Sequence, residues 1–351
     1  MKKELLIASA LTASLGMAGV AEAATASFSG NVRNGVSGSD TDGTADGTYG
    51  SDQKASLSFS VSETTDAGVK VSTGFNVQDE GTNDLGDANG LTFTFTDGSK
   101  IDVIEAGNAY ATHIASVPGA SGEQGLTGLT TNSAPTALTF GDTSDKVGFE
   151  WHSAADAFGV EGMKVGFSLA NGDDGDTSNT STAETSYSVG ISYTTTAGDT
   201  SVTVGGGFIN ADDSNTTTSN DRADATAIAG TATTGNLTVG VGFASGSYIA
   251  ARSGTSEEVD SAEVVTAGVK YVSGDITFAV GMVDGEGSDG SIGSNGSNTD
   301  TYESLSGSVD YVVASGVTAT IGYSDESAQD ENASLSANSG NSWYIGANVS
   351  F

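Results

Sequence analysis

The stretch Asn341-Ser-Trp-Tyr-Ile-Gly-Ala-Asn-Val-Ser-Phe351 decides the fold. Its apolar side chains occupy every second position, namely Trp343, Ile345, Ala347, Val349 and Phe351. Successive side chains of an extended chain point to opposite faces, so the pattern predicts a β-strand with one apolar and one mostly polar face. Two placements suit such a strand. It could lie in a soluble sandwich, or it could close a cylinder whose outer surface meets lipid.

The same period of two recurs along the chain, and this repetition favours the closed cylinder. Sixteen segments carry it: 26–33, 57–61, 69–77, 91–95, 101–103, 147–151, 163–169, 187–193, 202–208, 223–229, 237–243, 265–271, 276–282, 305–311, 317–323 and 343–351. Long acidic connections alternate with short turns such as 64–68, which is typical of bacterial outer-membrane barrels. The sequence therefore predicts an all-β protein, a 16-stranded antiparallel transmembrane β-barrel with long extracellular loops and short periplasmic turns. About sixteen strands leave an aqueous channel.

The amino-terminal residues predict export. Two lysines, a mostly apolar run and the small-x-small sequence Ala21-Glu22-Ala23 are typical of a secretory signal peptide, here residues 1–23. We expect residues 24–351 to form the barrel. The chain has 11 Lys+Arg, 45 Asp+Glu and no cysteine. This acidity argues against nucleic acid as a partner, whereas it suits cations.

The third long connection, residues 105–145, differs from the others. It contains both prolines, one of the two histidines (His113) and the apolar residues Ile114 and Val117. A solvated loop does not require these apolar side chains, and loops of this length are usually functional. We expect the connection to fold inward, pack on the barrel wall and narrow the pore.

Charged residues within the strands take the phase opposite to the apolar residues. This phase places side chains toward the lumen, since a cation facing lipid at the midplane costs about 2–4 kcal/mol. The candidate pore residues of this kind are Arg33, Lys54, Lys70, Asp102 and Glu150. Both signs of charge in the interior predict a water-filled passage. The second histidine, His152, follows Glu150 at the end of its strand.

Three short motifs resemble the general porins of alphaproteobacteria. They are Phe28-Ser-Gly-Asn-Val-Arg-Asn-Gly-Val36, Thr64-Thr-Asp-Ala-Gly68 and Ile101-Asp-Val-Ile-Glu-Ala-Gly-Asn-Ala109. The resemblance implies a homotrimer of sixteen-stranded barrels in which the third loop forms a constriction for small hydrophilic solutes.

The resemblance also implies an eyelet in which wall bases face loop acids. Carried over by position, Arg33 is a wall base with Lys54 and Lys70 as neighbours, and Glu105 and Glu123 are the loop acids; His113 lies in the same loop. With only three arginines in the chain, Arg33, Arg222 and Arg252, a strong transverse field does not follow from the sequence alone.

The resemblance further implies bound calcium, whose preferred ligands are carboxylate and carbonyl oxygens. The candidate calcium ligands form three clusters, Asp79, Glu80, Asp84 and Asp87; Asp173, Asp174 and Asp176; and Asp284, Glu286 and Asp289. None has the spacing of an EF-hand, and solvated acidic loops are the alternative. As a structural role we expect divalent ions to hold the loops together and bridge to lipopolysaccharide.

The function expected from the sequence is passive diffusion of small hydrophilic solutes and ions, with a preference for cations. No arrangement of residues supports catalysis, because abundant serines and two histidines do not define a triad. One alternative is a secreted, acidic, calcium-stabilised surface-layer or adhesive β protein. A second is a channel specific for one substrate.

Overall fold

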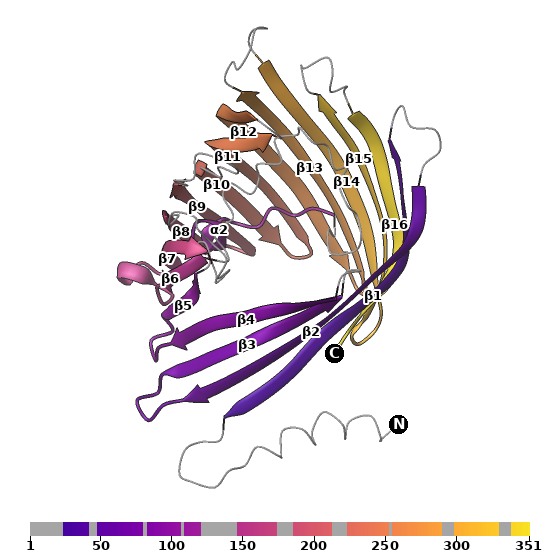
Figure 1. Cartoon of the computed structure of the whole chain (residues 1–351). Coiled ribbons are helices and arrows are strands. Elements are labelled where there is room, and N and C mark those ends of the chain that lie inside the picture. Colours follow the sequence, from indigo (N-terminus) through magenta and orange to yellow (C-terminus); the bar gives the residue numbers. More distant parts are fainter. Residues whose placement is uncertain are drawn as a thin grey trace.

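The computed structural model describes residues 24–41, 48–79, 83–106, 109–120, 146–173, 185–212, 223–252, 255–289, 298–329 and 338–351. These residues form sixteen strands, which make a single closed barrel, and two short helical turns (Figure 1). The first eight strands are β1 (Thr25–Thr41), β2 (Thr48–Thr64), β3 (Lys70–Asp79), β4 (Asn83–Thr94), β5 (Lys100–Ala106), β6 (Lys146–His152), β7 (Met163–Asp173) and β8 (Thr185–Ala197). The others are β9 (Thr200–Asp212), β10 (Ala223–Thr234), β11 (Leu237–Arg252), β12 (Thr255–Ser273), β13 (Ile276–Asp289), β14 (Asn298–Ala314), β15 (Val317–Gln329) and β16 (Asn338–Ser350). Helix α2 (Ala109–His113) follows β5, and the 3₁₀ turn η2 (Ala157–Gly159) follows β6.

Every strand pairs antiparallel with its neighbours in sequence, and β1 pairs with β16 to close the barrel. The closure register places Val32 opposite Val349, and Gly30 and Phe351 exchange two backbone hydrogen bonds of 3.0 Å. The predicted sixteen-stranded antiparallel barrel is therefore confirmed. Among the described residues, no helix is long and apolar enough to cross a membrane.

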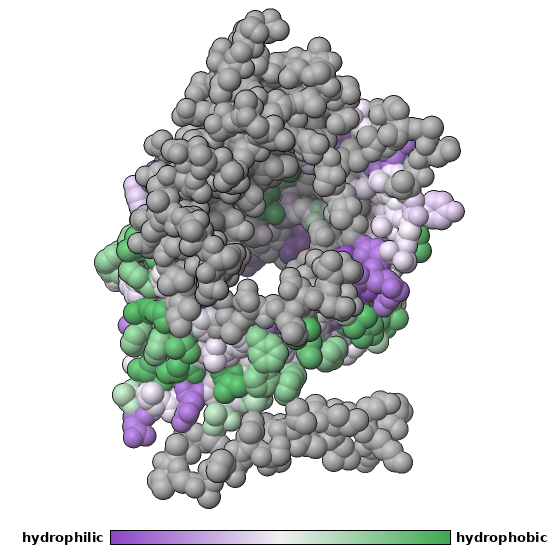
Figure 2. Space-filling model, viewed as in Figure 1, coloured by the Kyte–Doolittle hydropathy of each residue, from purple (hydrophilic) through white to green (hydrophobic). Residues whose placement is uncertain are grey.

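The two faces of the wall are those that the alternation predicts. On β13, Phe278, Val280 and Met282 are 44–52% exposed on the outer face, whereas Ala279 between them is 5% exposed. Figure 2 shows hydrophobic residues gathered on the outer side of the wall. Most large apolar side chains of the described strands thus point outward, whereas the inward positions are mostly small or polar; Ile209, Val264 and Tyr344 are buried exceptions.

Short turns connect the strands at one end of the barrel. In the turn between β4 and β5, Gly98 has a φ of 90°, which favours glycine. The backbone N–H and the hydroxyl of Ser99 donate to Asp97 Oδ1 at 2.9 and 2.7 Å, and these hydrogen bonds lower the pKa of the Asp97 carboxyl. The connection between β6 and β7 is longer and contains η2.

The strands extend well past their apolar segments, which differs from the predicted loop lengths. β11 continues to Arg252 and β12 begins at Thr255, and β3 and β4 similarly leave only residues 80–82 between them. Both faces of a strand that projects beyond lipid meet water, so backbone pairing continues there without an apolar period. Much of the acidic sequence that we expected to form loops is therefore strand. The predicted signal peptide, residues 1–23, and residues 121–145 of the third connection lie outside the described residues.

The orientation of the wall can be tested with a charged side chain on each face of β11. We expect Val241→Lys to destabilise the protein in lipid by about 2–4 kcal/mol, because Val241 lies in the middle of an outward apolar run. The control Thr238→Glu places a charge on the inner face of the same strand, opposite Lys270, and should change the free energy of unfolding by about 0.5 kcal/mol or less. Urea unfolding in lipid vesicles measures both, and equal losses would contradict the assignment of faces.

Candidate functional site

Helix α2 lies inside the barrel, against the inner faces of β7, β8 and β9 (Figure 1). Ala109 and Tyr110 are 0% and 4% exposed. Their backbone N–H groups donate to the hydroxyls of Ser168 on β7, at 3.4 Å, and Ser188 on β8, at 3.1 Å. The first N–H groups of a helix have no partner within it, so the wall serines satisfy these buried donors. The third connection therefore folds inward at this point, as its sequence predicts.

Beyond α2, residues 114–120 continue across the inner wall toward β13 and pass over wall positions that are occupied by glycine. A Cβ at Gly205 would overlap the carbonyl oxygen of His113, and one at Gly268 would overlap that of Pro118. A Cβ at Gly281 would lie 2.8 Å from the Cα of Gly119. Glycine at these positions lets the backbone of the segment approach the wall closely.

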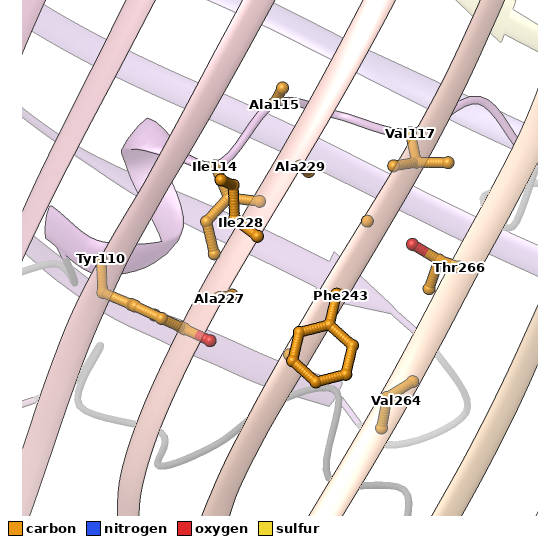
Figure 3. Close-up of a pocket in the computed structure, with 12 residues that line it drawn as sticks. Tyr110, Ile114, Ala115, Val117, Ala227, Ile228, Ala229, Phe243, Val264 and Thr266 are labelled. Atoms are coloured by element: carbon orange, nitrogen blue, oxygen red, sulfur yellow. The ribbon is translucent and has the colours of Figure 1, made fainter.

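A small apolar pocket remains between the segment and the wall (Figure 3). It measures about 180 Å³. Tyr110, Ile114 and Val117 line it from the segment, and small wall residues, including Ala227 and Ala229, line it from β10. This packing explains why the third connection contains apolar residues.

Next to α2, a cluster of polar side chains occupies the inner wall of β5 and β6. Asp102 and Glu150 lie directly opposite each other in the strand register. Glu150 is 4% exposed, and its Oε1 lies 2.7 Å from Nε2 of His152 and 3.2 Å from the hydroxyl of Thr112 on α2. Thr92 donates a hydrogen bond to Asp102. The buried carboxylate is therefore held by groups from both the wall and the segment.

His113 extends this cluster into a chain of hydrogen bonds. Its Nε2 lies 3.1 Å from Nδ1 of His152, and its Nδ1 lies 3.1 Å from the hydroxyl of Ser192 on β8. The chain Ser192–His113–His152–Glu150 thus joins α2 to two separate parts of the wall. The sequence nominated His113, Asp102 and Glu150 separately, and the structure brings them together with His152.

Arg33 forms a second charged group on the inner wall. Its Nη2 and Nε lie 2.7 and 3.1 Å from Asp52 Oδ1, and the β1–β2 register places it opposite Lys54. Tyr344 of β16 is fully buried on the same face, with its ring against Gly35. Sequence reasoning missed Asp52 because it lies between the predicted strand segments 26–33 and 57–61, whereas β2 begins at Thr48.

Other predicted pore residues lie apart from this group. Lys70 is the first residue of β3 and pairs with Thr64, ten residues along β2 from Lys54, or roughly 33 Å at the rise of a strand. The structure therefore does not bring Lys70 to Arg33. Glu105 belongs to β5, but its side chain is outside the described part of the chain, and so is the whole of Glu123.

The predicted calcium ligands lie mostly in strands instead of loops. Asp79 ends β3, Asp84 and Asp87 belong to β4, Asp173 ends β7, and Asp284, Glu286 and Asp289 belong to β13; Glu80, Asp174 and Asp176 lie outside the described residues. Asp284 and Glu286 are exposed on the outer face. Where side chains are described, the one set of three ligands that converges is Asp102, Glu150 and His152.

Comparison with known proteins identifies a family by a family model, but not by any curated relative. A family model described as Gram-negative porin matches residues 8–331. No curated protein is significantly similar to the chain in sequence.

Solved structures share the fold at low sequence identity. A porin refined at 1.8 Å is 18% identical with a TM-score of 0.55, and the match covers 93% of this chain and 100% of the other. OmpT of Vibrio cholerae in a trimer form is 18% identical with a TM-score of 0.60, covering 94% and 100%. OmpF of Salmonella typhi in complex with daunomycin is 16% identical with a TM-score of 0.63, covering 93% and 98%.

The close approach of the segment to the wall can be tested at Gly268. We expect Gly268→Ala to displace the segment, since the added Cβ overlaps the carbonyl of Pro118. Because the chain has no cysteine, a spin label at Ser116→Cys reports the segment specifically, and its spectrum should become more mobile. Gly307→Ala is the matched control, since its Cβ would meet its nearest atom at an ordinary 3.5 Å. Identical spectra for both alanine variants would show that Gly268 does not position the segment.

Proposed function

Because this chain belongs to the Gram-negative porin family, we propose that it forms a water-filled channel in which residues 109–120 narrow the passage for small hydrophilic solutes and ions. Family membership and the closed barrel indicate an outer-membrane channel for passive diffusion and point away from an enzyme. They also disfavour the alternative of a secreted surface-layer protein. The finer assignments, namely the constriction, the ion preference, the trimer and the bound calcium, form the proposal.

The attachment of α2 to the inner wall is the observation that carries the constriction. Buried serines hold the start of the helix, and His113 joins its end to β6 and β8. A segment fixed in this way reduces the cross-section that a solute can use, so the channel separates solutes by size.

A preference for cations follows from the charges. The chain has a formal net charge of −34. On the inner wall, Asp52 neutralises Arg33, whereas Asp310 and Glu326 add negative charge and accept hydrogen bonds from hydroxyls, at 2.5 Å from Thr320 and 2.8 Å from Ser324. Fixed negative charge along a pore raises the local concentration of cations.

Reversal potentials in a planar bilayer under a salt gradient test the ion preference. We expect the sign for cation selectivity, and we expect Asp310→Asn combined with Glu326→Gln to reduce the potential because both carboxylates face inward. Glu286→Gln, on the outer face, should leave it unchanged. Anion selectivity of the unmodified protein would overturn this part of the proposal alone.

We propose a homotrimer as the assembled form. The resemblance to alphaproteobacterial porins supports it, as does the fold shared with OmpT of Vibrio cholerae, which was solved in a trimer form. The apolar outer wall supplies surface both for lipid and for contact between barrels.

Bound calcium is part of the proposal, and acidic pairs on the outer face support it. The strand register places Glu263 opposite Glu286 and Asp284 opposite Glu303, and all four are exposed. Like charges directly opposite each other destabilise a sheet. A divalent ion offsets this repulsion and can bridge to phosphates of neighbouring lipopolysaccharide. The site therefore involves cross-strand pairs as well as the predicted clusters along the sequence.

Thermal unfolding in lipopolysaccharide-containing vesicles, with calcium or with EDTA, tests this role. We expect calcium to raise Tm, and we expect Glu263→Gln with Glu286→Gln to remove roughly 0.2–1 kcal/mol of that stabilisation. Glu161→Gln, exposed in the connection between β6 and β7, is the control and should preserve the calcium effect. A Tm that does not respond to EDTA would exclude structural calcium.

A further inference from the structure

The converging side chains on β5 and β6 can bind a metal of a different kind from calcium. One oxygen each of Asp102 and Glu150 and one ring nitrogen of His152 lie within 4.8 Å of one another. We propose that these three residues form a site for a divalent first-row transition metal such as Zn²⁺, and that His113 of α2 positions His152 for it.

The ligand set suits this class of ion. Imidazole favours zinc and its neighbours over calcium, and zinc accepts nitrogen and carboxylate oxygen at about 2.0–2.2 Å. Ligands around a tetrahedral ion then lie roughly 3.3 Å apart. His152 Nε2 and Glu150 Oε1 are 2.7 Å apart, so small side-chain movements suffice to admit the ion. Three protein ligands leave one position open to water.

Without metal, the hydrogen bonds can be satisfied with both histidines neutral. Ser192 donates to Nδ1 of His113, Nε2–H of His113 donates to Nδ1 of His152, and Nε2–H of His152 donates to Glu150. Each donor then has one acceptor, and among these four side chains only the carboxylate of Glu150 is charged.

Metal binding reverses the direction in which these hydrogen bonds are donated. The ion takes Nε2 of His152, so the proton of that ring moves to Nδ1 and is donated to Nε2 of His113. His113 in turn carries its proton on Nδ1 and donates it to Ser192. Each ring keeps one proton, and no proton leaves the three residues. A ligating histidine usually donates its other N–H to a fixed acceptor, and His113 supplies that acceptor.

Two lysines moderate the charge of the site. Lys100 lies opposite His152 in the register, Lys164 lies on β7, and both side chains are exposed. Two positive charges therefore lie on β5 and β7, on or next to the strands that carry the two carboxylates. The imidazole and the fixed geometry, and not net negative charge, therefore select the ion, which separates this site from the acidic outer face.

Metal titration of the purified, chelator-treated protein tests the proposal independently of conduction. We use Co²⁺, whose visible absorption reports coordination, and then Zn²⁺ in competition, with excess Ca²⁺ present to occupy carboxylate sites. We expect one Co²⁺ per chain, displaced by Zn²⁺. His152→Ala should weaken binding about 100-fold or more, and Glu286→Gln should have no effect.

The positioning role of His113 requires its own variants. We expect His113→Ala to weaken binding about 10-fold and to shift the Co²⁺ absorption band at saturation. His113→Gln should recover part of the affinity and part of the original absorption band, since the glutamine amide oxygen can accept a hydrogen bond from Nδ1–H of His152. Absence of binding to the unmodified protein, or equal binding by His152→Ala, would overturn the site; equal affinity and spectra for His113→Ala would overturn the role of His113.

Discussion

The structure depends on the requirement that every backbone hydrogen bond within lipid be made inside the protein. An unsatisfied N–H or C=O group there costs several kcal/mol, so an open sheet edge is not tolerated. The pairing of β1 with β16 removes the last edge, and the two hydrogen bonds between Gly30 and Phe351 extend that pairing to the final residue. With closure imposed, the alternation of side chains fixes an apolar exterior and a polar interior. Across the part of the wall that faces lipid tails, charged groups can therefore gather only on the inner face.

The fold could be predicted because its determinant is local. Alternation along 341–351 needs no knowledge of distant residues, and the same is true of the other fifteen segments. The strand ends could not be predicted from this signal. Between Phe243 and Val265 the sequence shows no sustained apolar period, yet β11 and β12 continue to pair as far as Arg252 and Thr255. Backbone pairing between two particular strands decides those boundaries.

The site could be predicted only in part because it depends on register. The phase of each strand correctly placed Asp102 and Glu150 on the inner face. That they lie opposite each other, and that His113 reaches His152 from a different element, follow from the pairing of β5 with β6 and from the path of the third connection. One signal was available, since His152 is two residues from Glu150 and shares its face. Asp52 was missed because the apolar alternation of β2 begins only at Leu57, nine residues after the strand itself begins at Thr48.

The strand lengths give the barrel an uneven rim. β5 and β6 contain 7 residues each, whereas β12 contains 19. At the rise of a strand this is roughly 23 Å of wall against 63 Å. On the tall side, exposed carboxylates such as Glu263 and Asp284 lie on the outer face just beyond the apolar residues, so this part of the wall projects past the lipid tails into headgroups and water.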